Sequence, residues 1–188
     1  MTKSSIAPLL AQALAAVGGS LDVRVEAEDD LDIITALYAE VRHAELAPLP
    51  WPDKAKRDFL DAQCRLQRDH YARHYAGAEL LIIERGGQPI GRIYVHATAT
   101  EIRLMEITVQ AAERNRGIGT CMIRALQDEA ARRAVPLTLH VEPANPAQRM
   151  YQRLGFQLIE NRGVYDFLGW GPEMGNGERG AGQAASCS

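Results

Sequence analysis

A strand, a glycine-containing turn, a helix and a second strand follow one another between Ile102 and Glu142. After the turn, the residues up to Ala134 place Ile118, Met122 and Leu126 on one helical face. The next segment, residues 136–142, alternates apolar and polar side chains, as a half-buried strand does. Two strands of one sheet that are joined by a crossover helix run parallel, with a right-handed connection. The chain is therefore predicted to contain at least one parallel strand pair covered by a helix.

Further strand and helix signals surround this unit. Residues 80–83 and 90–96 flank the Gly86-Gly87 turn, which predicts a hairpin that continues into the strand over 102–109 as an antiparallel meander. Strands are also expected at residues 23–27, 156–159 and 164–168. Helices are expected over residues 30–47, over 53–75 with Asp53 as its cap, and over 145–154. This element order predicts a mixed α+β fold.

The two ends of the chain differ from its middle. Residues 1–20 contain an Ala/Leu-rich run that Pro8 and Gln12 interrupt, which favours a helical or disordered arm over a secretory signal. Residues 171–188 are rich in Gly, Ser and Ala and offer little to bury, so a disordered tail is expected there. A single domain is predicted over residues 21–170.

Composition excludes several classes of protein. A formal charge of -3 argues against a general nucleic-acid-binding protein, which needs surplus Lys and Arg. No stretch approaches the roughly 20 apolar residues of a membrane span. The three cysteines form no Cys-x-x-Cys pair, which predicts reduced thiols and a cytoplasmic location. His70 and His74 are one helical turn apart but lack a third ligand, so no metal site is expected.

The turn before the long helix carries the chemical signal. Gly117 and Gly119 stand where that helix begins, and glycine lets a ligand approach the backbone closely. The first amides of a helix have no intrahelical acceptor, and its dipole adds positive charge there. Together with Arg114 and Arg116, these groups suit a pyrophosphate. A Gly-x-Gly pair alone is equally compatible with a merely structural turn.

The wider context of this turn points to one family. The string Arg114-x-x-Gly117-x-Gly119 follows the strand over 102–109. It precedes Asn145 and the segment Tyr151-Gln152-Arg153-Leu154-Gly155-Phe156. This arrangement resembles the GNAT superfamily of acetyl-CoA-dependent N-acetyltransferases. The resemblance covers about residues 21–168. It implies a GNAT-like fold, with a mostly antiparallel twisted sheet of six or seven strands, a splayed parallel pair and about four flanking helices. It also implies acetyl-CoA as cosubstrate and no metal.

The same resemblance assigns roles to individual residues. Backbone amides from Arg116 to Thr120 would hold the pyrophosphate, and free backbone groups of Ile107 and Val109 would pair with pantetheine and polarise the thioester carbonyl. Tyr151 would protonate the departing thiolate. Asn115 and Ala111 depart from the usual Gly and Pro, which does not block a backbone cradle. The full expected coenzyme set is Ile107, Thr108, Val109, Arg114, Asn115, Arg116, Gly117, Ile118, Gly119, Thr120, Asn145 and Tyr151.

A general base is needed because amide formation requires an uncharged amine. His140 is one candidate, since an unperturbed imidazole titrates near pH 6.5, and Glu106 on the preceding strand is its rival. Each is equally compatible with a purely structural role, and Tyr151 is also compatible with a core aromatic. Trp51 is expected either to line the acceptor pocket or to close the edge of the core.

Two functions follow from the resemblance. The first is an N-acetyltransferase in which a primary amine, from a small molecule or a protein, attacks acetyl-CoA directly in a ternary complex. The alternative is a non-catalytic acyl-CoA-binding or regulatory module. The resemblance also allows a homodimer. The acceptor is not defined, because the helices over residues 30–75, which decide it, carry no readable signal.

Overall fold

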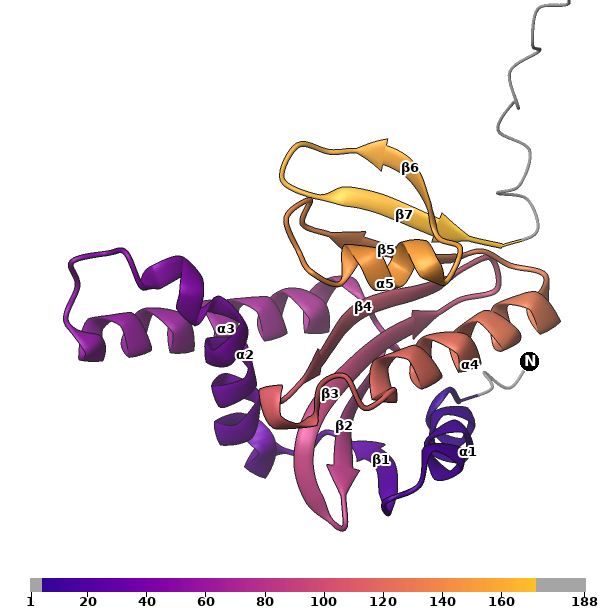
Figure 1. Cartoon of the computed structure of the whole chain (residues 1–188), viewed down its shortest axis with the longest axis horizontal. Coiled ribbons are helices and arrows are strands. Elements are labelled where there is room, and N and C mark those ends of the chain that lie inside the picture. The colour runs from indigo at the N-terminus through magenta and orange to yellow at the C-terminus, as the bar shows by residue number, and fades with distance from the viewer. Residues whose placement is uncertain (1–4, 172–188) are drawn as a thin grey trace, which may run out of the picture.

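The computed structural model describes residues 5–171, which form one seven-stranded sheet with helices on both faces (Figure 1). The strand order is β1-β2-β3-β4-β5-β7-β6, and every neighbouring pair is antiparallel except β4 and β5, which run parallel. The predicted α+β class, with a mostly antiparallel sheet and one parallel pair, is confirmed. The strands are β1 (Leu21–Val25), β2 (Glu79–Arg85), β3 (Gln88–Ala97), β4 (Ile102–Val109), β5 (Leu137–Val141), β6 (Gln157–Asn161) and β7 (Asp166–Trp170).

Five α-helices lie within the described residues, where about four were expected. They are α1 (Ala7–Val17), α2 (Leu31–Leu46), α3 (Asp53–His74), α4 (Ile118–Arg133) and α5 (Gln148–Arg153), with short 3-10 turns η1 (Glu28–Asp30) and η2 (Ala111–Glu113). The additional helix, α1, comes from the segment in which either a helix or disorder was expected. The expectation of a disordered tail falls on residues 172–188, outside the described range.

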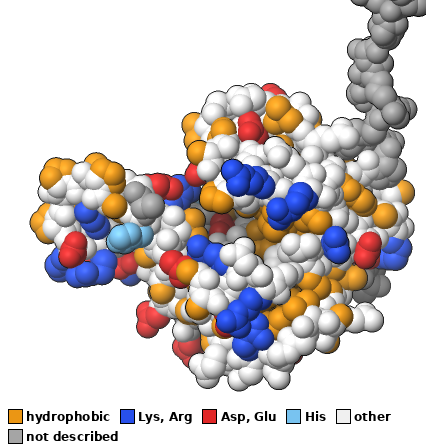
Figure 2. Space-filling view, in the orientation of Figure 1, with side chains coloured by type: hydrophobic (Ala, Val, Ile, Leu, Met, Phe, Trp, Pro, Cys, Tyr) orange, Lys and Arg blue, Asp and Glu red, His pale blue; other side chains and the backbone are white. Residues whose placement is uncertain are grey.

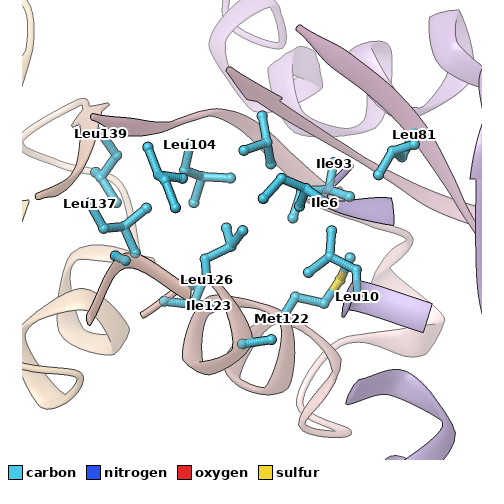
Figure 3. Packing of buried hydrophobic residues seen from close by; sticks show 14 of the residues in the cluster. Ile6, Leu10, Leu81, Ile93, Leu104, Met122, Ile123, Leu126, Leu137 and Leu139 are labelled. Atoms are coloured by element: carbon cyan, nitrogen blue, oxygen red, sulfur yellow. The ribbon is translucent and has the colours of Figure 1, made fainter. Parts of the chain in front are cut away.

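The main apolar core lies between one face of the sheet and helices α1 and α4 (Figure 3). Met122, Ile123 and Leu126 of α4 are fully buried, as are Leu10 and Leu14 of α1. Burial of each such side chain contributes about 2 kcal/mol relative to exposure. This face therefore supplies the rigid support for β4 and for the start of α4.

The opposite face of the sheet packs against α2 and α3 and is far more polar. Its apolar cluster contains only the buried Ile34, Cys64 and Ile82. Beside it lie the fully buried Arg92 and Tyr94 of β3. Buried polar groups need partners, so this face requires a hydrogen-bonded network between the sheet and α3.

Helices α2 and α3 form a hairpin that extends away from the sheet (Figure 1). The prediction that Asp53 caps α3 is wrong, because Pro52 occupies the N-cap position and no side-chain capping bond forms. Trp51, in the loop at the outer end of this hairpin, packs edge-on against Phe59 at 5.6 Å and is 42% exposed. Trp51 thus belongs to neither the core nor the sheet surface.

Candidate active site

Strands β4 and β5 separate part-way along their length. Only Ile102, Arg103 and Leu104 pair with β5, although β4 continues to Val109. The break coincides with a bulge, because Val95 of β3 faces Leu104 while Tyr94 faces Glu106, which makes Met105 the extra residue. A bulge bends its strand and increases the local twist. Residues 105–109 therefore present an edge with no strand partner among the described residues, and Figure 2 shows the surface hollowed between α5 and the loop before α4.

The backbone groups on this open edge follow from the pairing on the other side. The Gln110 amide donates to the Ile90 carbonyl at 2.9 Å, and Thr108 faces Arg92 in the ladder. Backbone groups alternate between the two edges of a strand, so those of Ile107 and Val109 point toward the gap. The structure thus brings Ile107 and Val109 to the open edge. Thr108 differs, since its backbone faces β3 and its hydroxyl donates to Glu106 at 2.5 Å.

The start of α4 forms an exposed cradle of amides. Gly117 is the N-cap residue, with φ of 83°, and a Cβ added there meets no atom within 4 Å. Cys121 is the first residue whose amide reaches an intrahelical acceptor, the Gly117 carbonyl at 2.9 Å. The amides of Ile118, Gly119 and Thr120 therefore point out of the helix end, which is the geometry that binds anions. Asn115, at φ of 61°, adopts the left-handed conformation despite having a side chain.

The two arginines of this loop are held by carboxylates. Arg114 donates to the Val109 carbonyl at 2.8 Å and to Glu40 of α2 at 2.8 Å, and Glu40 also accepts from the Ala111 amide. Arg116 lies 3.6 Å from Glu113. The positive charge expected at this rim is thus largely compensated within the protein, and Arg114 serves to fix the loop on β4.

Helix α2 spans the gap between the separated strands. Glu40 binds the loop after β4, and Arg42, half a turn further along, forms an ion pair with Glu142 next to β5 at 3.0 Å. Burial lowers the pKa of Arg42, but Glu45 and Glu142 raise it by more. The pKa of Arg42 therefore lies above its ordinary value. The gap is therefore bounded by β4, β5 and α2.

Helix α5 closes another side of the gap. Asn145 accepts a hydrogen bond from the Ala147 amide at 2.9 Å, in the turn just before this short helix, whose N-cap residue is Ala147. Tyr151 is 5% exposed and packs edge-on against Phe156 at 5.6 Å, which places its ring in the main core. Within residues 5–171 its hydroxyl has no hydrogen-bond partner. Burial raises the pKa of Tyr151 well above its ordinary value, and the charge of Glu106 raises it further, so the phenol stays protonated.

Glu106 sits at the start of the open edge, on the side of the sheet that faces α3. One of its oxygens accepts from Thr108 and lies 3.6 Å from the buried guanidinium of Arg92, and the other accepts from Gln67 of α3 at 3.4 Å. Arg92 in turn donates to Gln67 at 3.1 Å and contacts Tyr94. A carboxylate has about four acceptor positions, so this network orients Glu106 and leaves room for a ligand.

His140 lies on β5 beyond the last residue paired with β4. Its ring stacks on Phe167 at 4.7 Å, and its Nε2 is 3.2 Å from the guanidinium of Arg162. Burial lowers the pKa of His140, and Arg103 and Arg162 lower it further. The imidazole is therefore neutral near pH 7, but one of its nitrogens is already engaged by an arginine.

No group of three or more metal-ligating side chains occurs within residues 5–171. The rings of His70 and His74 stack on each other at 4.4 Å. In the same part of the chain, no helix is long and apolar enough to cross a membrane.

Two residues that contact the candidate site residues, Glu40 and Arg92, were not predicted from the sequence. Glu40 is 74 positions from Arg114, and nothing in the local sequence of α2 marks it as the partner of that arginine. Arg92 lies in the middle of the apolar run of residues 89–95, and a charged residue in such a run is a signal of a buried ion pair that the sequence already contains.

The comparisons with known proteins agree with this geometry. The family model described as "Acetyltransferase (GNAT) family" matches residues 37–156, which is more than half of the chain. No curated protein matches the sequence.

Similar solved structures share the fold at low identity. The PaiA N-acetyltransferase of Thermoplasma acidophilum, in complex with coenzyme A, is 14% identical with a TM-score of 0.62, over 81% of this chain and 99% of that one. An acetyltransferase of Thermus thermophilus is 14% identical, with a TM-score of 0.59, over 81% of this chain and 97% of that one. A protein of Corynebacterium glutamicum is described as "histone acetyltransferase HPA2 and related acetyltransferase". It is 19% identical, with a TM-score of 0.56, over 81% of this chain and 96% of that one. With the family model matching across the separated strands and the α4 cradle, the chain belongs to the GNAT family of acetyltransferases.

Proposed function

We propose that the chain transfers an acetyl group from acetyl-CoA to a primary amine by direct attack within a ternary complex. The observation that carries this proposal is the unpaired edge of β4, residues 105–109, followed in the chain by the exposed amides at the start of α4. The cradle suits the pyrophosphate of coenzyme A, and the edge suits an extended arm that pairs with backbone groups as a strand would. A structure with coenzyme A bound exists for the PaiA relative, which supports the same class of cosubstrate here.

The proposal assigns the coenzyme contacts to residues of the α4 cradle and of the open edge of β4. The amides of Ile118, Gly119 and Thr120 would bind the pyrophosphate, and Arg116 lies at the same rim. The amide and carbonyl of Ile107 and the amide of Val109 would bind the pantetheine arm, because the Val109 carbonyl is already taken by Arg114. The side-chain NH₂ of Asn145 would bind the arm, while its side-chain oxygen accepts from the Ala147 amide.

The chemical step needs one group that removes a proton and one that supplies it. The amine nitrogen attacks the thioester carbon, the C–N bond forms and the C–S bond breaks. Glu106 takes the proton that the amine loses, and Tyr151 protonates the thiolate of coenzyme A. Transfer of the proton from Glu106 back to Tyr151 through solvent balances the cycle.

Glu106 is preferred to His140 as the base on geometric grounds. Glu106 lies on the open part of β4, next to Ile107, whose backbone groups are proposed to bind the thioester arm. His140 is flanked by Phe167 and by Arg162, which occupies its Nε2. A protonated His140 beside two arginines would also be unfavourable.

The proposal is tested by thiol release from acetyl-CoA across a panel of amines, with the acetylated product identified by mass. We expect amine-dependent release with at least one acceptor class. If coenzyme A stabilises the protein but no amine gives release above the background rate, the enzymatic proposal fails and the alternative of a non-catalytic acyl-CoA-binding module is supported.

A further inference from the structure

A line of polar contacts crosses the face of the sheet that α3 covers, from Glu26 to Glu106. At its first end, Arg68 of α3 lies 2.5 Å from one oxygen of Glu26, and the Tyr94 hydroxyl donates to the other oxygen. Arg92 donates to the Tyr94 hydroxyl at 3.5 Å and lies 3.6 Å from Glu106. One hydroxyl and one guanidinium thus connect a carboxylate just after β1 to the proposed base on β4.

Arg92 is the central member of this line, and its burial is unfavourable in itself. Its side chain is 1% exposed, and no other charged residue of the described chain is as fully buried. The Nε of Arg92 is also buried without a hydrogen-bond partner among residues 5–171. A buried ion pair adds little net stability, and apolar side chains of similar volume often serve a fold equally well. The guanidinium therefore points to a role other than stability.

The guanidinium of Arg92 contacts three separate elements. Its Nη1 faces Tyr94 on the same strand, and its Nη2 donates to Gln67 of α3 at 3.1 Å and lies near Glu106 of β4. Gln67 closes the triangle, because its amide donates to Glu106 at 3.4 Å. Burial lowers the pKa of Arg92, but the charge of Glu106 and its other neighbours raise it by more, so the guanidinium stays charged. Arginine can hold three such partners because its donors lie in one rigid plane.

The two ends of the line differ in how tightly they are held. Glu26 is 4% exposed and has its ion pair at 2.5 Å. Glu106 is 20% exposed, and apart from the Thr108 hydroxyl its contacts, with Arg92 and Gln67, are 3.4 Å or longer. Catalytic groups of unliganded enzymes are often held this loosely. Glu26 is therefore the anchor, and Glu106 is the end that a bound amine can engage.

We propose that Arg92 is a positioning residue for acetyl transfer, which orients the Glu106 carboxylate at the open edge of β4 while Tyr94 fixes the guanidinium from behind. This inference rests on the proposed function, because it concerns the orientation of the proposed base. Arg92 is buried and contacts neither the acceptor nor the coenzyme. Its loss therefore slows the chemical step and leaves the binding of both substrates nearly unchanged.

The test is the steady-state kinetics of Arg92→Met, in which an apolar side chain replaces the guanidinium. With an amine that the unmodified protein acetylates, kcat should fall at least about tenfold, as for the loss of a hydrogen bond to a charged group. The KM of the amine and the Kd of coenzyme A should change by less than about twofold. Arg92→Lys should recover only part of the rate, because an ammonium keeps the charge but not the planar fork. In a Glu106→Gln background, Arg92→Met should lower kcat no further.

Two milder variants test the same role without removing a buried charge. Tyr94→Phe deletes only the hydroxyl behind Arg92, and Gln67→Met removes the amide between Arg92 and Glu106. Each should lower kcat by at least about threefold and leave the Kd of coenzyme A unchanged. The matched control is Glu129→Gln, which breaks buried ion pairs of α4 outside this line and should lower Tm but not kcat.

An unchanged kcat in Arg92→Met, or in both milder variants where Arg92→Met does not fold, overturns the positioning role and leaves the proposed function intact. So does an equal further loss from Arg92→Met in the Glu106→Gln background, since Arg92 would then act independently of Glu106. A fall in kcat that follows the fall in Tm in the control as well assigns the effect to stability and also overturns the role. Absence of amine-dependent thiol release by the unmodified protein overturns the proposed function and this inference together.

Discussion

Gly117 offers the sharpest test of the cradle, because the effect of a side chain on the fold can be separated from its effect on a ligand. Its φ of 83° is a left-handed conformation, which costs an L-residue about 1 kcal/mol. A Cβ there meets open space, so no steric cost is added. Gly117→Glu should therefore lower the free energy of unfolding by about 1 kcal/mol, or lower Tm by about 3 °C for a chain of this length.

The effect on ligand binding should be much larger. Coenzyme A at one hundred times its Kd stabilises the unmodified protein by about 2.7 kcal/mol, which corresponds to a rise in Tm of about 8 °C. In Gly117→Glu this rise should disappear, because a carboxylate would lie beside the helix-start amides and repel the pyrophosphate. The assay is thermal unfolding with and without coenzyme A.

Gly163 provides the matched control for this experiment. It has φ of 78°, also meets no atom within 4 Å and lies in the β6–β7 turn. Gly163→Glu should therefore show the same loss of stability and the full rise in Tm with coenzyme A. A full rise in Gly117→Glu as well would refute the placement of the pyrophosphate at the start of α4.

Four further predictions address catalysis and stability. Tyr151→Phe should lower kcat by about a hundredfold while leaving the Kd of coenzyme A unchanged, and an unaltered kcat would exclude Tyr151 as the acid. Glu106→Gln should lower kcat/KM by at least about a hundredfold at pH 7, whereas His140→Gln should change it only a few-fold; the reverse order would make His140 the base. Deleting Met105 should abolish coenzyme A binding, as measured by calorimetry, because the strand would lose its bulge; retained binding would show that the bulge does not create the site. Arg132 and Arg133 hold the pKa of Glu129 at about 2, so its stabilisation is present above pH 4.5 and is lost as the pH falls toward 2. Glu129→Gln should thus cost about 2 kcal/mol at pH 7 and almost nothing near pH 2 in denaturant unfolding, and a cost that does not change with pH would contradict this role.

Local signals predicted the elements and the order in which the chain uses them. The alternation in Leu137, Leu139 and Val141 and the Gly86-Gly87 turn correspond to β5 and to the β2–β3 hairpin. The glycines at the start of α4 also lie where expected, with Gly117 in a left-handed conformation. These features depend on neighbours within a few residues, and so the sequence contains them directly.

Features that depend on distant residues could not be predicted in the same way. The ion pair of Arg114 with Glu40 joins segments 74 positions apart and ties the loop after β4 to α2. The place of α1 in the main core depends on the exposed face of the sheet that it covers, not on its own Ala-rich sequence. Tertiary packing decides such contacts, and a single sequence does not report which surfaces meet.

The phase of the apolar residues in β4 connects the fold to the proposed chemistry. Ile102 and Leu104 face the main core, and a regular strand would turn residue 106 to the same side. The core-facing residues after the bulge are instead Ile107 and Val109, so the extra residue Met105 shifts the alternation by one position. The shift turns Glu106 toward Arg92 and the polar face, and the bend separates β4 from β5 at the same residue. One inserted residue thus places the proposed base on the face of the sheet that α2 and α3 cover, and it opens the edge proposed to bind the thioester arm. The apolar pattern of residues 102–109 already contains that shift.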